Sequence, residues 1–146
     1  MIYCDTREKK WSHIKDYFDK NEIKYESKKL EFGDYQNSDY PSVVIDRKAS
    51  LEELVNNLVP GSNNFTRFMK EIRKAYTEKG VFIILIEKDI KSWEELKQWK
   101  SYWSNYDGKW LYAKMKSLSK AYNVHWIFCN KKETAERILK YTKYEY

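Results

Sequence analysis

Two short stretches of the sequence carry the side chains best suited to chemistry. The first contains Asp34, and the second is the run 43–48, which ends in Asp46, Arg47 and Lys48. Two carboxylates that converge can hold Mg²⁺, a hard cation that prefers oxygen ligands and takes others from water or phosphate. A lysine beside such a metal can orient or deprotonate an attacking water. Taken alone, the same residues also fit solvated charge and turn chemistry.

The run 43–48 is predicted to be a buried strand, because it opens with consecutive apolar residues. Side chains alternate between the two faces of a strand. Asp46 and Lys48 therefore share one face, whereas Arg47 points to the other. Asp34 lies in an extended segment that can pair with this strand as a hairpin, which would bring the two carboxylates together.

The order of these residues resembles the signature of the XPF-type structure-specific nucleases, a branch of the PD-(D/E)xK superfamily. The family pattern G-D, then E-R-K-x-x-x-D, is similar to Gly33-Asp34, Asp46-Arg47-Lys48 and Glu52 of this chain. The segment 5–8 resembles the family's D-x-R-E, and the resemblance extends over residues 2–140. The chain departs from the pattern at Asp46, where many members have Glu, and at Glu52, where many have Asp.

The resemblance implies a DNA endonuclease that depends on Mg²⁺ or Mn²⁺. It implies that Asp34, Asp46 and the backbone carbonyl of Arg47 hold the metal, with Lys48 positioning the water. It also implies a functional Arg47, whereas strand alternation leaves a structural ion pair equally open. The residues expected one layer outside the metal ligands are Asp5, Arg7, Glu8 and Glu53.

Glu52 and Glu53 compete for the last position of the motif. Ser50 can cap a helix whose third residue is Glu53, so Glu53 has a structural explanation as part of a capping box. Glu52 is then the better candidate for the metal neighbourhood, acting through water or through Lys48.

A second candidate surface is the helix predicted over 65–79. Its apolar side chains recur at helical spacing and are expected to face the core: Phe65, Phe68, Met69, Ile72 and Tyr76. Its basic side chains fall mainly on the remaining surface: Arg67, Lys70, Arg73 and Lys74. A basic helix face can bind DNA phosphates, although such a face is more often only solvated.

Aromatic residues gather in segment 93–112, the part least similar to the family. The segment 93–106 alone carries Trp93, Trp99, Tyr102, Trp103 and Tyr106. Packing is the ordinary explanation for such a cluster. The sharper alternatives are a platform that stacks unpaired bases and a surface that docks a partner.

Composition bounds the remaining classes. The 146 residues suggest one domain, and 42% hydrophobic residues are enough for a core. A formal net charge of +6 favours an anionic partner. No apolar run is long enough for a membrane span, and no signal sequence is visible. Cys4 and Cys129 are isolated, which argues against zinc and fits a reducing compartment.

These patterns predict an α/β fold, a restriction-endonuclease-like mixed sheet of about five strands with helices on both faces. We expect one nuclease domain over residues 1–146, without the tandem helix-hairpin-helix domain that the family often adds. DNA affinity would then come from this domain, a second copy or another protein. Such a compact form is compatible with a phage or mobile element, acting in the cytoplasm or at the nucleoid.

The expected activity is cleavage of branched or flapped DNA in repair or recombination. The alternative is a catalytically silent DNA-binding or scaffold module of the same fold. The resemblance also predicts a homodimer, formed through the helices near the C-terminal end. The aromatic residues of that region are Trp110, Tyr112, Tyr122, Tyr141 and Tyr144, and an exposed aromatic patch is typical of a contact surface.

Overall fold

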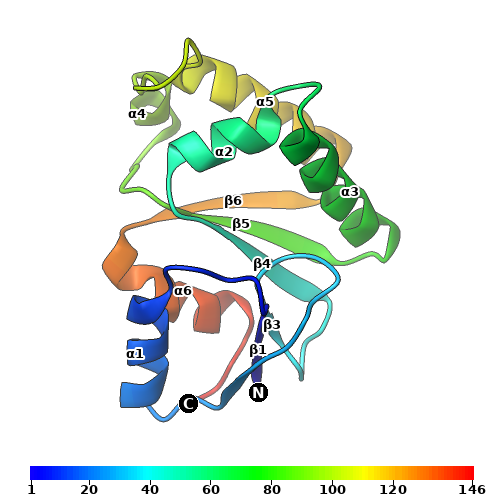
Figure 1. Ribbon diagram of the computed structural model, residues 1–146, viewed down its shortest axis with the longest axis vertical. Coiled ribbons are helices and arrows are strands. Elements are labelled where there is room, and N and C mark those ends of the chain that lie inside the picture. Colours follow the sequence, from blue (N-terminus) through cyan, green and yellow to red (C-terminus); the bar gives the residue numbers. More distant parts are fainter.

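Strand β4 (Val43–Lys48) lies in the middle of a six-stranded mixed sheet in the computed structural model, which describes residues 1–146 (Figure 1). The strand order is β2-β1-β3-β4-β5-β6. The other strands are β1 (Ile2–Cys4), β2 (Tyr25–Ser27), β3 (Tyr35–Asn37), β5 (Val81–Glu87) and β6 (Val124–Cys129). The predicted mixed α/β architecture is confirmed.

The long strands β4, β5 and β6 run parallel to one another, whereas β3 pairs antiparallel with β4. Parallel neighbours need a crossover connection, which here is helical in both cases. The interior strand β5 is a continuous apolar run up to Ile86, as expected of a strand covered on both faces. The carboxyl ends of these three strands therefore lie at the same end of the sheet.

Helices cover both faces of the sheet (Figure 1). Those on one face are α2 (Leu51–Leu58), α3 (Asn63–Thr77), α4 (Trp93–Lys97) and α5 (Gly108–Ala121). Those on the other are α1 (Ser12–Lys20) and α6 (Thr134–Tyr141), the latter preceded by the 3₁₀ turn η1 (Lys131–Glu133). Val44 belongs to the first hydrophobic cluster and Ile45 to the second, so β4 contributes to both.

The structure differs from the sequence prediction in two places. The sheet has six strands instead of about five, since β2 and β3 are separate strands on either side of β1. Tyr76 is 52% exposed and packs edge-on against Tyr122 instead of facing the core. Within the aromatic segment 93–112, residues 93–97 form the short helix α4, residues 98–107 form a loop, and residues 108–112 begin α5.

None of the helices has the length and the apolar character needed to span a bilayer.

Candidate active site

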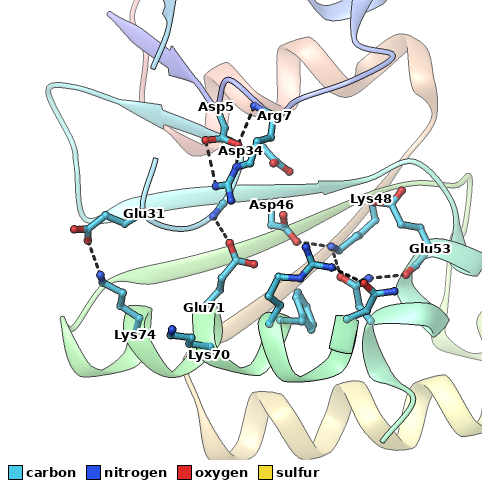
Figure 2. Close-up of a pocket in the computed structure, with 15 residues that line it drawn as sticks. Asp5, Arg7, Glu31, Asp34, Asp46, Lys48, Glu53, Lys70, Glu71 and Lys74 are labelled. Atoms are coloured by element: carbon cyan, nitrogen blue, oxygen red, sulfur yellow. Dashed lines mark hydrogen bonds and ion pairs between the residues drawn. The ribbon is translucent and has the colours of Figure 1, made fainter. Parts of the chain in front are cut away.

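A polar cleft of about 530 Å³ opens between α3 and the segment 28–34 (Figure 2). Fifteen residues line it, and Phe68 is the only hydrophobic one. Asp34, Asp46 and Lys48 are among the lining residues. The structure thus brings together the two carboxylates and the lysine that the sequence singled out.

Asp34 owes its position to the glycine before it. Gly33 has a φ of +74°, and a Cβ added there would lie 2.2 Å from a methyl carbon of Val44, so a side chain would be excluded. The Asp34 amide donates to the carbonyl of Ile45 at 2.7 Å. The Asp34 carboxylate in turn accepts from the Arg47 amide at 2.7 Å. The hairpin with β4 therefore fixes both the backbone and the side chain of Asp34.

Asp46 and Lys48 form a buried pair on the α3 side of β4. Lys48 Nζ lies 2.8 Å from Asp46 Oδ2 and donates to Asn57 Oδ1 at 2.6 Å. The ammonium also lies 4.7 Å from the centroid of the Phe68 ring. Burial lowers the pKa of Lys48, but the Asp46 and Asp34 carboxylates outweigh it and raise that pKa above 10.5. Lys48 is therefore a cation, suited to orienting a water or a phosphate.

The two carboxylates are crowded. Burial, followed by the charge of Asp46, raises the pKa of Asp34 well above its ordinary value. Asp46 Oδ2 is buried and accepts no hydrogen bond of good geometry, although Lys48 is close. Buried anionic oxygens held side by side without enough donors are what a divalent cation would satisfy.

The donor set is small but fits Mg²⁺. No group of three or more His, Cys, Asp or Glu side chains is arranged to hold a metal ion. Mg²⁺ is commonly bound through one or two carboxylates, with water and substrate phosphate completing its shell. The Arg47 amide points toward β3, and in an extended strand the carbonyl of a residue points the same way. This carbonyl therefore faces the side of β4 on which Asp34 lies.

The Arg47 side chain does not line the cleft, as strand alternation predicted, and it shares a face of β4 with Val43 and Ile45 of the second hydrophobic cluster. Its guanidinium pairs with Glu8 at 2.9 Å and with Glu87 at 2.5 Å, and it donates to the Lys9 carbonyl at 2.6 Å. Arg47 is 6% exposed. The Arg47 side chain therefore anchors the segment after β1, and only its backbone reaches the carboxylates.

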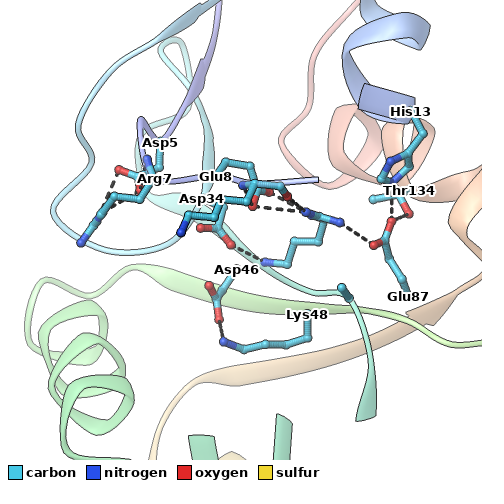
Figure 3. Close-up of polar contacts among 12 residues, drawn as sticks. Asp5, Arg7, Glu8, His13, Asp34, Asp46, Lys48, Glu87 and Thr134 are labelled. Atoms are coloured by element: carbon cyan, nitrogen blue, oxygen red, sulfur yellow. Dashed lines mark hydrogen bonds and ion pairs between the residues drawn. The ribbon is translucent and has the colours of Figure 1, made fainter. Parts of the chain in front are cut away.

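Glu87 ends β5 and connects this ion pair to two further residues (Figure 3). Its carboxylate accepts from the Thr134 hydroxyl at 2.6 Å and lies 2.6 Å from His13 Nε2. Burial raises the pKa of Glu87, but these hydrogen bonds and the charge of Arg47 outweigh it and lower that pKa below 4.5. The sequence gives no sign of these partners, because His13 and Thr134 lie far from Glu87 along the chain.

Asp5 and Arg7 brace the roof of the cleft (Figure 2). Arg7 Nε lies 2.8 Å from Asp5 Oδ2. Asp5 accepts from the Leu30 amide at 2.9 Å, and Arg7 donates to the Leu30 carbonyl at 3.2 Å. Burial raises the pKa of Asp5, but the Arg7 and Leu30 donors outweigh it and lower that pKa. This pair therefore holds the irregular segment 28–34 over the site.

The structure does not place Glu52 at the cleft. Its carboxylate accepts from the Ser101 hydroxyl and from the Tyr102 amide, at distances of 2.7–2.9 Å. Glu53 lines the cleft instead and accepts from the Ala49 amide at 3.0 Å. Adjacent residues of a helix point about 100° apart, so only one of the two faces the cleft. The expectation that Glu52 serves the metal neighbourhood is wrong in placement.

The basic residues of α3 divide between two surfaces. Arg67, Lys70 and Lys74 line the cleft, and Lys74 pairs with Glu31 across it at 2.9 Å. Arg73 does not line the cleft, and it donates to the Tyr122 hydroxyl at 3.3 Å. A phosphate in the cleft would therefore meet three of the four residues that the sequence grouped together.

Sequence reasoning missed Glu71, which α3 directs into the cleft (Figure 2). Glu71 accepts from the Gly33 amide at 3.2 Å. Burial and the charge of Asp46 raise the pKa of Glu71. The available signal was its spacing, because Glu71 lies four residues after Arg67 and three before Lys74 and so shares their face.

The chain is similar to known proteins in two respects, its sequence family and its fold. The ERCC4 domain family model matches residues 4–141. XPF from Aeropyrum pernix is similar with a TM-score of 0.69 and 22% sequence identity, covering 97% of this chain and 59% of that chain. XPF from Aeropyrum pernix in complex with DNA gives a TM-score of 0.69 and 23% identity, covering 97% and 62%. No curated protein matches the chain significantly.

The chain thus spans about 60% of the length of these two XPF structures. At this level of identity the structural likeness establishes the fold, and the family match covers nearly the whole chain.

Proposed function

This chain belongs to the ERCC4 domain family, and we propose that it is a divalent-metal-dependent DNA endonuclease. One observation carries the proposal. Asp34, Asp46 and Lys48 meet in a polar cleft whose opposite wall is the basic face of α3. Carboxylates for a metal, a buried ammonium and a wall for phosphates are the parts that phosphodiester hydrolysis requires.

In this proposal Asp34 and Asp46 hold Mg²⁺ or Mn²⁺, with the carbonyl of Arg47 as a third ligand. The bound cation would supply Lewis acidity at the scissile phosphate and lower the pKa of a water. The carboxylates fix the position of the site, because both are set by the β3–β4 hairpin. Asp5 and Arg7 keep the roof segment in place.

Lys48 acts in the proposal as a fixed positive charge. Its ammonium is held by Asp46 and Asn57 and is raised in pKa. From this position the ammonium can donate hydrogen bonds that orient the attacking water or a phosphate oxygen. Pre-positioned donors of this kind stabilise charge that grows in the transition state.

We propose branched or flapped DNA as the substrate. The structure of XPF from Aeropyrum pernix in complex with DNA supports DNA as the ligand class. The net charge of +6 and the three basic residues on the cleft wall are consistent with a phosphate backbone. We also propose that the active form is a homodimer, which would present two sites related by a two-fold axis.

The test is nicking of supercoiled plasmid and of flapped DNA by the wild type, with Mg²⁺ and with EDTA, beside Asp46→Asn. We expect metal-dependent cleavage by the wild type and loss of cleavage in the variant, with DNA affinity kept or improved. Removing the carboxylate charge weakens metal binding, and it also reduces the electrostatic repulsion between residue 46 and the DNA phosphates. A wild type that binds DNA but never cleaves it would make the chain a catalytically silent module of the same fold. If the variant cleaves DNA at the wild-type rate, Asp46 is not part of the active site.

A further inference from the structure

The loop 98–107 exposes two aromatic side chains that nothing in the fold explains. Tyr102 is 85% exposed and Trp103 is 80% exposed, the highest values among the exposed large hydrophobic residues. Their rings contact each other at 4.8 Å between centroids with planes at 76°. The other aromatic residues of the segment, Trp99 and Tyr106, pack against the core. Trp99 and Tyr106, at the base of the loop, therefore stabilise the fold. The exposed side chains of Tyr102 and Trp103, which form the tip of the loop, do not.

The backbone under these rings is ordered by hydrogen bonds. Ser101 Oγ accepts from the amides of Trp103 and Ser104 at 3.2 and 3.1 Å. The Ser101 amide donates to the Tyr106 carbonyl at 3.0 Å. Rings presented on a fixed backbone lose little conformational entropy on binding. The tip is thus prepared to make a contact.

The loop is also attached to the wall of the cleft. Glu52 on α2 accepts from the Ser101 hydroxyl and the Tyr102 amide. The next residue, Glu53, lines the cleft, and only two residues separate the end of β4 from the start of α2. The tip therefore has a fixed position relative to Asp46 and Lys48. This explains what Glu52 does in the position where the sequence suggested a catalytic acid.

The loop itself carries a positive charge, that of Lys100, and no negative one between residues 98 and 106. Glu52 is already used by the loop, and the Asp107 carboxylate caps α5 by accepting from the Trp110 amide at 2.9 Å. Sites for single-stranded nucleic acids combine aromatic side chains, on which bases stack, with positive charge for the backbone; the exposed pair supplies the first and Lys100 contributes to the second.

We propose that Tyr102 and Trp103 form a stacking site for an unpaired base of branched DNA, on the loop that Glu52 attaches to α2. This inference rests on the proposed function and adds to it the feature by which the domain would distinguish a flap from a duplex. Stacking accepts any base, because every base has a π-face. The site would therefore select DNA structure and not sequence.

The test compares affinity for a flapped DNA with affinity for a fully paired duplex of the same length, by fluorescence anisotropy in EDTA. Alanine replacement of a stacking aromatic weakens binding by about 5- to 100-fold per base. We expect Trp103→Ala to weaken flap binding by such a factor and to reduce the ratio of flap to duplex affinity. Trp103→Phe should restore most of the ratio, and Trp103→Leu should not, because leucine has no π-face.

The matched control is Tyr146→Ala, which removes another strongly exposed aromatic residue and should leave the ratio at the wild-type value. An unchanged ratio in Trp103→Ala, or an equal loss on flap and duplex, would overturn the stacking site. The stacking site would also be overturned if, without DNA, Trp103→Ala had half the molar mass of the wild type. The tip would then be a contact between protein chains. Metal-dependent nicking by the wild type is scored separately, so failure of the loop does not count against the nuclease.

Discussion

Adjacent residues of β4 have separate tasks. Asp46 and Lys48 face the cleft, whereas the side chain of Arg47 is buried on the opposite face among Glu8 and Glu87. Strand alternation made this division predictable from the sequence. The partners of Arg47 were not predictable, because Glu87 lies forty residues away and only the parallel pairing of β4 with β5 brings it near.

Lys48→Ala should slow cleavage about 10²- to 10⁴-fold, the usual value of a positioned acid–base or orienting group, with a modest loss of DNA affinity. The measurement is single-turnover cleavage at saturating protein, together with affinity as a function of salt. A salt slope reduced by about one with unchanged single-turnover rates would make Lys48 a phosphate contact only.

Glu87→Gln should destabilise the fold by about 3 kcal/mol at neutral pH, because it leaves the buried Arg47 charge with one partner fewer. The pKa of Glu87 is lowered in the folded state, so its stabilisation is present above its ordinary pKa of 4.5 and is lost as the pH falls below that value. Urea unfolding should therefore show a large difference between variant and wild type at neutral pH and a smaller one in acid.

The matched control for Glu87 is Glu94→Gln, which removes an exposed pair with Lys97. An exposed pair is worth less than about 1 kcal/mol, so this variant should unfold like the wild type. Equal effects of the two substitutions would contradict a buried role for Glu87.

Element by element, the sequence predicted the long strands and helices well and the connections poorly. The runs 43–45 and 81–86 carry a continuous apolar signal. Ser50 marks the start of α2, because its side chain caps that helix. The segment 28–34 carries no such signal, because its shape comes from Asp5 and Arg7 far away in the sequence. Where local signals end, contacts between distant residues decide the structure.

Helix α3 allows a test of the cleft wall within a single element. Lys70→Ala and Arg67→Ala should each reduce the slope of log affinity against log salt by about one, because each removes one phosphate contact. Arg73→Ala is the matched control, since Arg73 does not line the cleft and its loss should leave the slope unchanged. If Arg73→Ala lowers the slope and Lys70→Ala does not, the DNA binds on the opposite side of α3.

The five aromatic residues expected at a dimer contact are distributed over the whole molecule. Trp110, Tyr112 and Tyr122 pack against the cluster under α2, α3 and α5, whereas Tyr141 and Tyr144 pack against the cluster under α1 and α6. An apolar hollow beside the edge strand β6 is lined by Trp93, Tyr112, Met115 and Trp126, among others. The dimer that we propose would bury this edge.

Light scattering without DNA should give twice the chain mass of 17.9 kDa, and Tyr112→Asp should reduce it to one chain, because a buried carboxylate is costly at an interface. Tyr40→Asp, at another exposed aromatic residue, should leave the dimer intact. A mass of one chain for the wild type throughout the micromolar range would exclude the homodimer.

The attachment of the loop to α2 through Glu52 has a geometric consequence. If the tip binds the branch and the cleft cleaves the backbone, the rigid connection between them keeps the two sites at a fixed distance. That distance sets the number of nucleotides between the branch and the cleavage position. The wild type should then release products of one dominant length from flaps of many sequences. Glu52→Ala frees the loop and leaves the carboxylates of the cleft in place, so the products should spread over neighbouring lengths on a sequencing gel.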